Sequence, residues 1–245
     1  MDYGKEFKKY AVGHLGLNSL TTEDVVNHQV NSMTPMIIEE RQMNVISMSV
    51  FDRLMKERII WLSATVESRM ASVIQAQLMF LDSVEKKDIT MHIDTPGGNV
   101  LSGLGIRDVM NYVNSDVATI NTGMCASMGS ILISSGSKGK RSSLISSQVM
   151  THMVSHSSGG NIQETRINQL EAEKYNYILF KILSENCGKT FDEIYEISRH
   201  DKWYNSNEAL SFGLIDEIIG FSEENNISKM LEGFDDYYKR EILKN

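Results

Sequence analysis

Two short motifs in the chain hold residues that could do chemistry, and each follows an apolar run typical of a β-strand. The first, at residues 94–98, reads DTPGG and precedes a stretch with helical spacing. A Pro-Gly-Gly turn before a helix leaves backbone N–H groups free to hold an anion or the oxyanion of a reaction intermediate. Taken alone, the motif is better explained as an ordinary tight turn.

The second motif, at residues 122–130, reads TGMCASMGS and places Ser127 among small residues between an apolar strand and an apolar helix. This is a suitable position for a nucleophile. It is not the G-x-S-x-G elbow of α/β-hydrolases, because Cys125 stands where glycine is required. A phosphate-binding P-loop is also excluded, since Gly139 and Lys140 are followed by arginine. Taken alone, Ser127 is better explained as a buried serine at the start of a helix.

A nucleophilic serine needs a base, and the base needs a carboxylate to orient it. Among the six histidines, His152 ends an alternating, strand-like run, whereas His156 lies in a polar segment that contains glycine. A strand holds a side chain more rigidly than a loop does, so His152 is the better candidate base. The other four histidines fit this role less well: His14 and His28 near the N-terminus, His92 in the middle of a strand, and His200 just before Asp201.

The composition excludes several classes of protein. The chain has 245 residues and a formal net charge of −8, and its basic residues are scattered, which argues against nucleic-acid binding. Its two cysteines, Cys125 and Cys187, are too few for a disulfide framework or a four-ligand zinc site. We find neither a signal-peptide pattern nor an apolar run long enough to span a membrane. We therefore expect a soluble, cytoplasmic, globular protein.

Strand-like and helix-like segments alternate through the middle of the chain, which predicts an α/β fold with parallel strands covered by helices. The predicted strands span residues 58–66, 88–95, 117–122 and 214–219, and residues 144–154 are predicted to contain a further strand. The predicted helices span residues 69–81, 100–113, 126–135, 162–183, 191–197 and 205–212. The last of these has a clear start and stop, with Asn205 as a cap, Glu208 near the third position and Gly213 at the end.

Taken together and in order, these motifs resemble the proteolytic subunit of the Clp protease family. The resemblance rests on the turn at residues 96–98, the ASMGS segment around Ser127, the VMTH segment ending at His152, and Asp201. The intervals of 25 residues from Ser127 to His152 and 49 residues from His152 to Asp201 are also those of the family. The similar region extends from residue 36 to residue 219.

The resemblance implies a crotonase-like α/β fold of repeated β-β-α units, with a helix and a strand that protrude as a handle. It divides the chain into an N-terminal extension at residues 1–35, a peptidase domain at 36–221, and an acidic, helical C-terminal tail at 222–245. The extension would be either an ordered arm or a propeptide that the enzyme removes.

The resemblance also implies the roles of the site residues. Ser127 would be the nucleophile, His152 the general base and then acid, and Asp201 the carboxylate that fixes the imidazole tautomer. The backbone N–H groups of Gly98 and Met128 would form the oxyanion hole. Such an enzyme is a serine endopeptidase that hydrolyses peptide bonds through an acyl-enzyme. Neither a metal nor another cofactor is implied.

The partners implied by the resemblance are further protein chains. Heptameric rings would stack in pairs as a tetradecamer around a closed chamber, and would contain this chain alone or together with a paralogous subunit. An AAA+ unfoldase of the ClpX or ClpA/ClpC type would feed unfolded proteins into the chamber. Because the chain has no ATP-binding motif, any dependence on ATP must belong to that partner. Neither nucleic acid nor a membrane is an expected partner.

The chain departs from the family pattern next to the catalytic residues. His152 is followed by Met153 and Val154, where the family has Gln-Pro. His200 stands where an arginine used in contacts between rings is common. Since histidine titrates near pH 6.5, we expect His200, together with His156, to make ring pairing sensitive to pH.

A third departure concerns the unfoldase. His92 replaces an aromatic residue of the family's unfoldase-docking pocket, although Tyr112 still matches that pocket. We expect this change to affect how tightly an unfoldase binds.

Two other functions stay open. A non-catalytic or regulatory subunit of a mixed Clp complex would have no reason to keep Ser127, His152 and Asp201 at the family spacing. An acyl-CoA hydratase or isomerase of the related crotonase fold would share the oxyanion hole, but such enzymes usually rely on acidic residues and need no serine. Labelling with a fluorophosphonate distinguishes an active serine peptidase from both.

Overall fold

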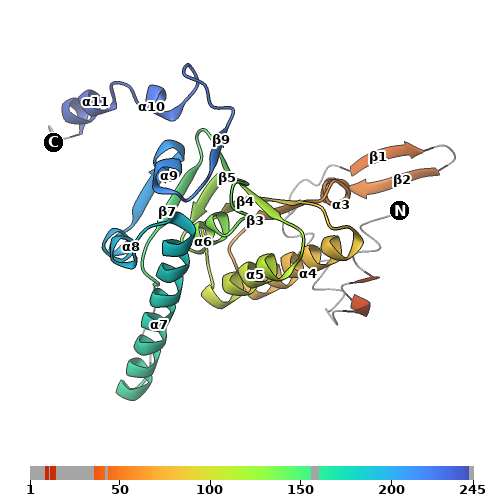
Figure 1. Cartoon of the computed structure of the whole chain (residues 1–245), viewed down its shortest axis with the longest axis horizontal. Helices are drawn as coiled ribbons and strands as arrows, with labels where there is room; N and C mark the ends of the chain where they lie inside the picture. Colours follow the sequence, from red (N-terminus) through yellow and green to blue (C-terminus); the bar gives the residue numbers. More distant parts are fainter. Residues whose placement is uncertain (1–8, 11, 15–35, 42–43, 156–159, 243–245) are drawn as a thin grey trace.

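The computed structural model describes residues 9–10, 12–14, 36–41, 44–155 and 160–242 of the chain. A central sheet with helices packed on it forms the body, from which three parts project (Figure 1). These parts are the hairpin of β1 (Met36–Arg41) and β2 (Asn44–Ser49), the long helix α7 (Ile162–Cys187), and the C-terminal segment with α10 (Ile227–Met230) and α11 (Phe234–Glu241). No helix among the described residues is long and apolar enough to cross a membrane.

Seven strands of the described chain form the central sheet. Its main path runs in the order β3 (Ile59–Ser63), β4 (Ile89–Thr95), β5 (Val117–Ala126), β6 (Arg141–Leu144) and β9 (Glu217–Ile219), and all of these neighbours are parallel. The last part of β5 pairs instead with β7 (Gln148–Thr151), also in parallel. The remaining strand, β8 (Lys202–Asn205), pairs with β7 in the antiparallel direction.

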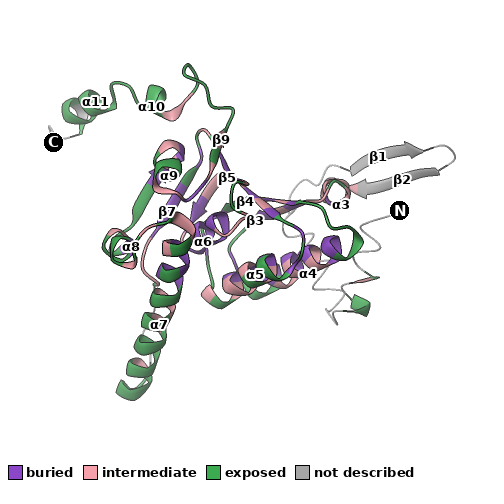
Figure 2. Ribbon diagram, viewed as in Figure 1, coloured by how far each residue is buried: buried purple, intermediate pink, exposed green. Residues whose placement is uncertain are grey.

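Helices α4 (Ser68–Val84), α5 (Val100–Tyr112) and α6 (Met128–Ser134) pack on one face of the sheet and bury the core against it (Figure 2). In β4, the side chains of Ile89, Met91 and Ile93 are fully buried, whereas Thr90 and His92 alternate with them and are half-buried. Full burial of such an apolar side chain stabilises the fold by about 1.5–3 kcal/mol. The alternation therefore determines which face of the sheet meets the helices.

The other face of the sheet is less well covered in the described chain. Trp61 and His92 are neighbours in register on β3 and β4, and their rings stack with centroids 4.9 Å apart. Ile120, the next neighbour on β5, is half-buried like them. Partial burial lowers the pKa of His92, which favours the neutral form of its ring. Parallel sheets are normally covered on both faces, so this face is suited to further packing.

Most of the predicted elements are confirmed. The helices predicted at residues 69–81, 100–113, 126–135, 162–183, 191–197 and 205–212 correspond to α4, α5, α6, α7, α8 (Phe191–Ser198) and α9 (Ser206–Phe212). The predicted ends of α9 are also correct, because Asn205 and Glu208 form a reciprocal capping box and Gly213 has a left-handed backbone with φ +94°. The C-terminal helices α10 and α11 fall within the predicted helical segment.

The strand predicted within residues 144–154 is confirmed as β7, although it does not fill the whole range. The chain leaves β6 at Leu144 and starts β7 at Gln148. Between them, the Ser147 hydroxyl donates to the carbonyl of Asn121, and the Asn121 amide donates to the carbonyl of Gln148. These side-chain hydrogen bonds occupy the place where a continuous strand would pair with the backbone of β5.

Two other parts of the fold were not predicted. The antiparallel strand β8 is an addition to the parallel strands that the sequence predicts. The hairpin β1–β2 and helix α3 (Val50–Lys56) occupy a region to which the sequence pattern assigned no element. Helix α3 begins with a capping box between Ser49 and Asp52, and this pair of residues is a sequence signal for the start of a helix.

Helix α7 is the helical part of the predicted handle. Its 26 residues make it about 39 Å long. It starts at a capping box between Asn161 and Glu164 and ends at Gly188, whose backbone is left-handed. Its buried residues, Leu179, Phe180, Ile182 and Leu183, all lie toward its C-terminal end. The N-terminal part of α7 therefore stands clear of the body (Figure 2).

The predicted N-terminal extension is described only at residues 9–10 and 12–14. There the ring of Tyr10 packs against Phe80 of α4, with centroids 5.6 Å apart. The rest of the extension, with His28, lies outside the described residues, as do His156 and the neighbouring part of the predicted handle strand.

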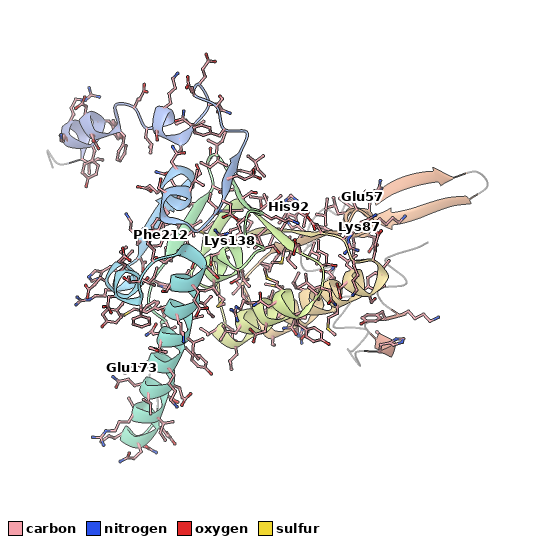
Figure 3. All side chains as sticks on the ribbon, in the orientation of Figure 1. Glu57, Lys87, His92, Lys138, Glu173 and Phe212 are labelled. Atoms are coloured by element: carbon pink, nitrogen blue, oxygen red, sulfur yellow. The ribbon has the colours of Figure 1, made fainter. Side chains whose placement is uncertain are left out.

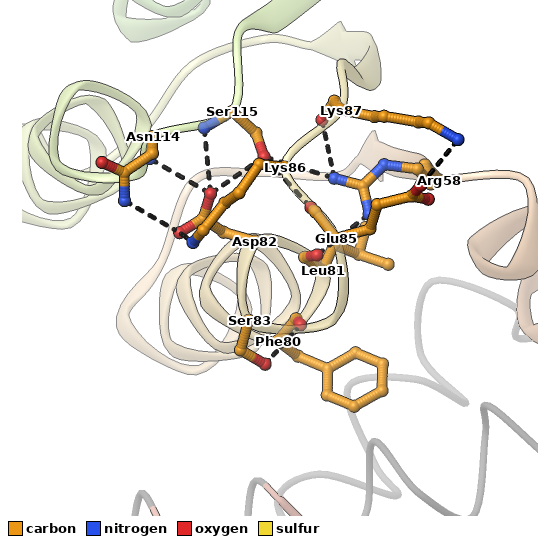
Figure 4. A network of polar contacts seen from close by, with 10 residues as sticks. All are labelled: Arg58, Phe80, Leu81, Asp82, Ser83, Glu85, Lys86, Lys87, Asn114 and Ser115. Carbon is orange, nitrogen blue, oxygen red and sulfur yellow. Dashed lines mark hydrogen bonds and ion pairs between the residues drawn. The ribbon is translucent and has the colours of Figure 1, made fainter.

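A polar network fastens the C-terminal end of α4 to the loop before β5 (Figure 4). The carboxylate of Asp82 accepts hydrogen bonds from the backbone N–H groups of Asn114 and Ser115, at 3.1 and 2.9 Å. It also accepts one from the Ser115 hydroxyl, at 2.8 Å, and pairs with Lys86. Burial raises the pKa of the Asp82 carboxyl, but these hydrogen bonds outweigh burial and lower the pKa to about 2.

Arg58 extends this network to the start of β3. Its guanidinium donates to the backbone carbonyls of Leu81, Lys87 and Asp88. Its backbone has a φ of +62°, which is uncommon for a residue with a side chain. The three hydrogen bonds to carbonyl groups hold Arg58 in this conformation at the entry to the sheet.

Replacing Asp82 with asparagine keeps the shape of the side chain but removes its charge. In the folded protein the pKa of the Asp82 carboxyl is about 2, below its ordinary 3.8. The contribution of the charged carboxylate to the free energy of unfolding is therefore complete well above pH 3.8 and is lost as the pH falls through about 2. We expect Asp82→Asn to be less stable by about 2 kcal/mol at pH 7, with a smaller difference at pH 3. Urea unfolding of both proteins at pH 7, 5 and 3 measures this. A difference that does not change with pH would contradict this explanation.

Candidate active site

Ser127 lies on the sharp turn between β5 and α6. Its φ is +53° and its ψ is −118°, a strained conformation for a residue other than glycine. Its backbone N–H donates to the carbonyl of Met150, at 2.9 Å, which ties the turn to β7. A serine at the start of a helix usually caps it, but the hydroxyl of Ser127 caps no N–H of α6. The turn therefore leaves the hydroxyl available for another partner, and Ser127 is half-buried, not the buried helix-start serine that its motif alone suggests.

That partner is His152, which directly follows β7. Its Nε2 lies 2.8 Å from the Ser127 Oγ. Its Nδ1 lies 3.3 Å from a carboxylate oxygen of Asp201. The carboxylate favours the tautomer with the proton on Nδ1, which makes Nε2 an acceptor for the serine proton. The structure thus brings together the three side chains that were 25 and 49 residues apart in the sequence.

The pairing of β7 with strands on both sides explains why these three residues meet. In the parallel pair, Ala126 of β5 lies beside Met150 of β7, so Ser127 comes next to the end of β7. In the antiparallel pair, Thr151 lies opposite Lys202, and one further step of this register puts His152 opposite Asp201. The role of Asp201 was predicted from the family resemblance, whereas β8 was not predicted. The sequence signal for β8 is the short run KWYN after Asp201, because aromatic residues are enriched in strands.

The Pro-Gly-Gly turn packs directly against the turn of Ser127. A Cβ atom on Gly97 would lie 2.6 Å from the carbonyl oxygen of Ala126 and 2.7 Å from the Cβ of Ser127. A Cβ atom on Gly98 would lie 2.3 Å from the carbonyl oxygen of Val66. Both glycines also have positive φ, of +93° and +149°. Only glycine allows the two turns to approach this closely.

Two backbone N–H groups beside Ser127 have no internal acceptor. Within the described chain, neither Gly98 nor Met128 donates a backbone hydrogen bond. The bridge between Val66 and Gly98 instead uses the carbonyl of Gly97 and the N–H of Asn99. Gly98 and Met128 both border the same pocket as Ser127 and His152. Their N–H groups are thus available to a ligand in that pocket.

The pocket beside Ser127 has a volume of about 230 Å³. Apolar side chains of α5, α6 and α7 form much of its wall: Val100, Ile131, Leu179, Phe180 and Leu183. Met153 and Val154, which follow His152, complete it. The pocket therefore suits an apolar side chain. The contribution of α7 to this wall was not predicted, because the long helix contacts the site only near its C-terminal end.

Asp94 is a further residue of the site that sequence analysis treated only as part of the turn. Its carboxylate accepts the N–H of Met124 at 2.9 Å, at an irregularity in the pairing of β4 with β5. A Cβ atom on Gly123 would lie 2.7 Å from the Asp94 carboxylate. Asp94 thereby fixes the end of β5 immediately before the turn of Ser127.

Neither cysteine is suited to act as a nucleophile. Burial raises the pKa of the Cys125 thiol well above its ordinary value, and the nearby Asp94 raises it further. Burial likewise raises the pKa of Cys187, to about 11. Both thiols are therefore protonated at neutral pH, and thiolate is the nucleophilic form.

Comparison with known proteins identifies the family. The model of the Clp protease family matches residues 41–222. The chain belongs to the Clp protease family. It is therefore a serine peptidase with the crotonase-like α/β fold, and both sequence predictions are confirmed.

Curated relatives of this family match most of the chain. The ATP-dependent Clp protease proteolytic subunit of Bacteroides fragilis (strain YCH46) is 44% identical over 215 residues, which cover 87% of this chain and 98% of the relative. The protein of the same name from Porphyromonas gingivalis is also 44% identical, over 87% of this chain and 97% of the relative. The protein of the same name from Streptococcus pyogenes serotype M5 is 42% identical over 198 residues, which cover 79% of this chain and 98% of the relative. These similarities favour neither of the alternative functions.

The close packing of the Pro-Gly-Gly turn against the turn of Ser127 can be tested by adding a side chain at Gly97. Gly97→Ala should push the Pro-Gly-Gly turn away from Ser127, and a displacement of about 1 Å in a catalytic site costs on the order of 100-fold in rate. We expect a loss of this size in peptide hydrolysis. Gly139→Ala is the matched control, because Gly139 also has a positive φ of +82° but nothing lies within 4 Å of its added Cβ. Equal activity in the two variants would contradict the role of the close approach.

Proposed function

We propose that this Clp family member hydrolyses peptide bonds with Ser127 as nucleophile, His152 as general base and acid, and Asp201 as the orienting carboxylate. The observation that carries the proposal is the 2.8 Å contact between the Ser127 Oγ and the His152 Nε2. A positioned base of this kind contributes about 10²–10⁴-fold to the rate. The carboxylate of Asp201 stabilises the imidazolium that forms when His152 takes the proton.

In the first half of the reaction, the Ser127 Oγ attacks the carbonyl carbon of the peptide while His152 accepts the hydroxyl proton. The tetrahedral intermediate carries a negative oxygen, which the N–H groups of Gly98 and Met128 would bind. Removal of one such donor costs about 3 kcal/mol in comparable enzymes. When the C–N bond breaks, His152 returns the proton to the departing amine, leaving an acyl ester on Ser127.

In the second half, water replaces the amine. His152 takes a proton from the water as its oxygen attacks the ester carbonyl, and the same N–H groups stabilise the second intermediate. The C–O bond to Ser127 then breaks, and His152 gives the proton back to the serine oxygen. The products are a free carboxylate and the original enzyme, so no cofactor is consumed.

The substrate preference follows from the pocket beside Ser127. Its wall of Val100, Ile131, Leu183 and neighbouring apolar side chains suits a substrate with an apolar residue before the cleaved bond. A charged side chain would lose its hydration there without gaining a partner. We propose that unfolded polypeptides, which expose such residues, are the substrates.

We propose that the chain works in an oligomer, as two stacked heptameric rings, with this chain alone or a paralogous subunit in each ring. The half-covered face of the sheet around Trp61, His92 and Ile120 supports packing against further chains, since parallel sheets are seldom left open. A ring would enclose the sites and restrict access to unfolded chains.

We also propose that a Clp ATPase in the cytoplasm, of the ClpX or ClpA/ClpC type, supplies those chains. The relatives are named as ATP-dependent, while this sequence contains no P-loop, so the nucleotide would be bound by a separate subunit. Tyr112, which is 76% exposed at the end of α5, is a candidate contact for that partner.

The role of Ser127 can be tested by removing its hydroxyl. Ser127→Ala should lower peptide hydrolysis by about 10⁴-fold or more and prevent labelling by a fluorophosphonate. The matched control is Ser130→Ala, because Ser130 borders the same pocket but its hydroxyl donates only to the carbonyl of Ser127. Labelling of the Ser127→Ala protein at full rate would exclude the proposed nucleophile.

We further propose that the N-terminal extension, residues 1–35, is removed by the enzyme itself. Intact mass spectrometry of the purified assembly should then show a chain that starts between Met33 and Met36 for the wild type and the full chain for Ser127→Ala. An active, assembled wild-type sample that keeps all 245 residues would contradict self-processing.

A further inference from the structure

Residues 152–155, which we term the strap, connect β7 to the handle and carry the candidate base His152. Two cavities border the strap. One is the catalytic pocket of about 230 Å³, and the other is a second cavity of about 530 Å³. Met153 borders both. Met153 and Val154 pack against the hydrophobic core, but the two cavities leave part of the Met153 side chain without packing contacts.

The second cavity is formed by α7 and α8. It is lined by Met153 of the strap, by Glu173, Asn176, Tyr177 and Phe180 of α7, and by Phe191 and Tyr195 of α8. Glu173 is labelled on the projecting part of α7 in Figure 3, one turn before Asn176. Asn176 is half-buried, and the buried residues Leu179 and Phe180 follow it one turn later. Asn176 thus lies where α7 leaves the body and is held firmly by the packed end of the helix.

A single backbone hydrogen bond holds the strap within the described part of the chain. The N–H of Val154 donates to the Oδ1 of Asn176, at 2.7 Å. Every residue of β7, by contrast, pairs with β8, and most also pair with β5. A proline at position 154 would have no N–H to donate.

We propose that Asn176 is a positioning residue for the reaction, acting through the N–H of Val154. By fixing Val154, it sets the path of the strap. The strap in turn keeps His152 within reach of Ser127 and keeps Met153 and Val154 in the wall of the catalytic pocket. Asn176 touches neither the candidate triad nor the substrate in this arrangement. The inference rests on the proposed role of Ser127 and His152.

The first experiment compares two substitutions of similar size. Asn176→Leu removes the acceptor, whereas Asn176→Asp keeps an oxygen at the same position. Loss of one hydrogen bond worth about 1 kcal/mol corresponds to about a fivefold change. We expect Asn176→Leu to lower kcat/KM for a short peptide, and the rate of fluorophosphonate labelling, about fivefold. Asn176→Asp should restore both to within about twofold of the wild type.

A double-mutant cycle tests whether the effect passes through Val154. Val154→Pro removes the donor and should also lower labelling about fivefold. Once Asn176 is leucine, Val154→Pro should cause little further loss, because the hydrogen bond is already absent. A merely structural role for Asn176 in α7 would instead make the two losses multiply. Gln169→Leu, which removes an exposed α7 amide that bonds only to Glu173, is the control for changes in the helix itself.

Native mass and melting temperature should be measured for every variant, so that losses from misfolding or disassembly are recognised. Wild-type kinetics in well-assembled Asn176→Leu, or multiplying losses in the double mutant, would overturn the proposal. If Asn176→Leu keeps full activity while Ser127→Ala has none, this inference fails and the proposed function stands. If Ser127→Ala stays active, the proposed function itself fails.

Discussion

The candidate active site depends on one constraint, which is that β7 pairs with two strands at once. Its parallel pairing with β5 places Ser127 beside it, and its antiparallel pairing with β8 places Asp201 opposite His152. A slip of one residue in either register would move these side chains to the wrong position or the wrong face. Backbone hydrogen bonds between strands thus determine geometry that the side chains alone, with an exposed Asp201, could not hold.

The features around β7 serve the same arrangement. The strained backbone of Ser127 directs its hydroxyl away from α6, and the glycine turn at residues 96–98 packs against it without side chains. Asp94 fixes the end of β5 through the N–H of Met124. Farther away, the network of Asp82 and Arg58 fastens the end of α4 to the segments that precede β3 and β5 (Figure 4). The packing of the core around the strained turn compensates for the free energy that the strain costs.

Much of this fold could be predicted from the sequence, because its helices have clear periodicity and caps, as at Asn205 and Gly213. The triad residues were identified by resemblance, since spacing alone could not distinguish Ser127 from a buried helix-start serine. What the sequence did not reveal depends on contacts between distant segments. The break before Gln148 comes from hydrogen bonds with Asn121, and β8 is too short to show a pattern. The contact of Asn176 with Val154 joins a helix to a segment 22 residues away, and no periodicity predicts it.

The central claim is that Ser127, His152 and the two free N–H groups form one reaction site. The most direct measurement is a crystal structure of the assembled protein after reaction with a fluorophosphonate, whose phosphorus then stands for the tetrahedral carbon. We predict a covalent bond to the Ser127 Oγ, with one phosphoryl oxygen within about 3 Å of the N–H groups of Gly98 and Met128. A label on another residue, or a phosphoryl oxygen that faces away from both N–H groups, would contradict the account.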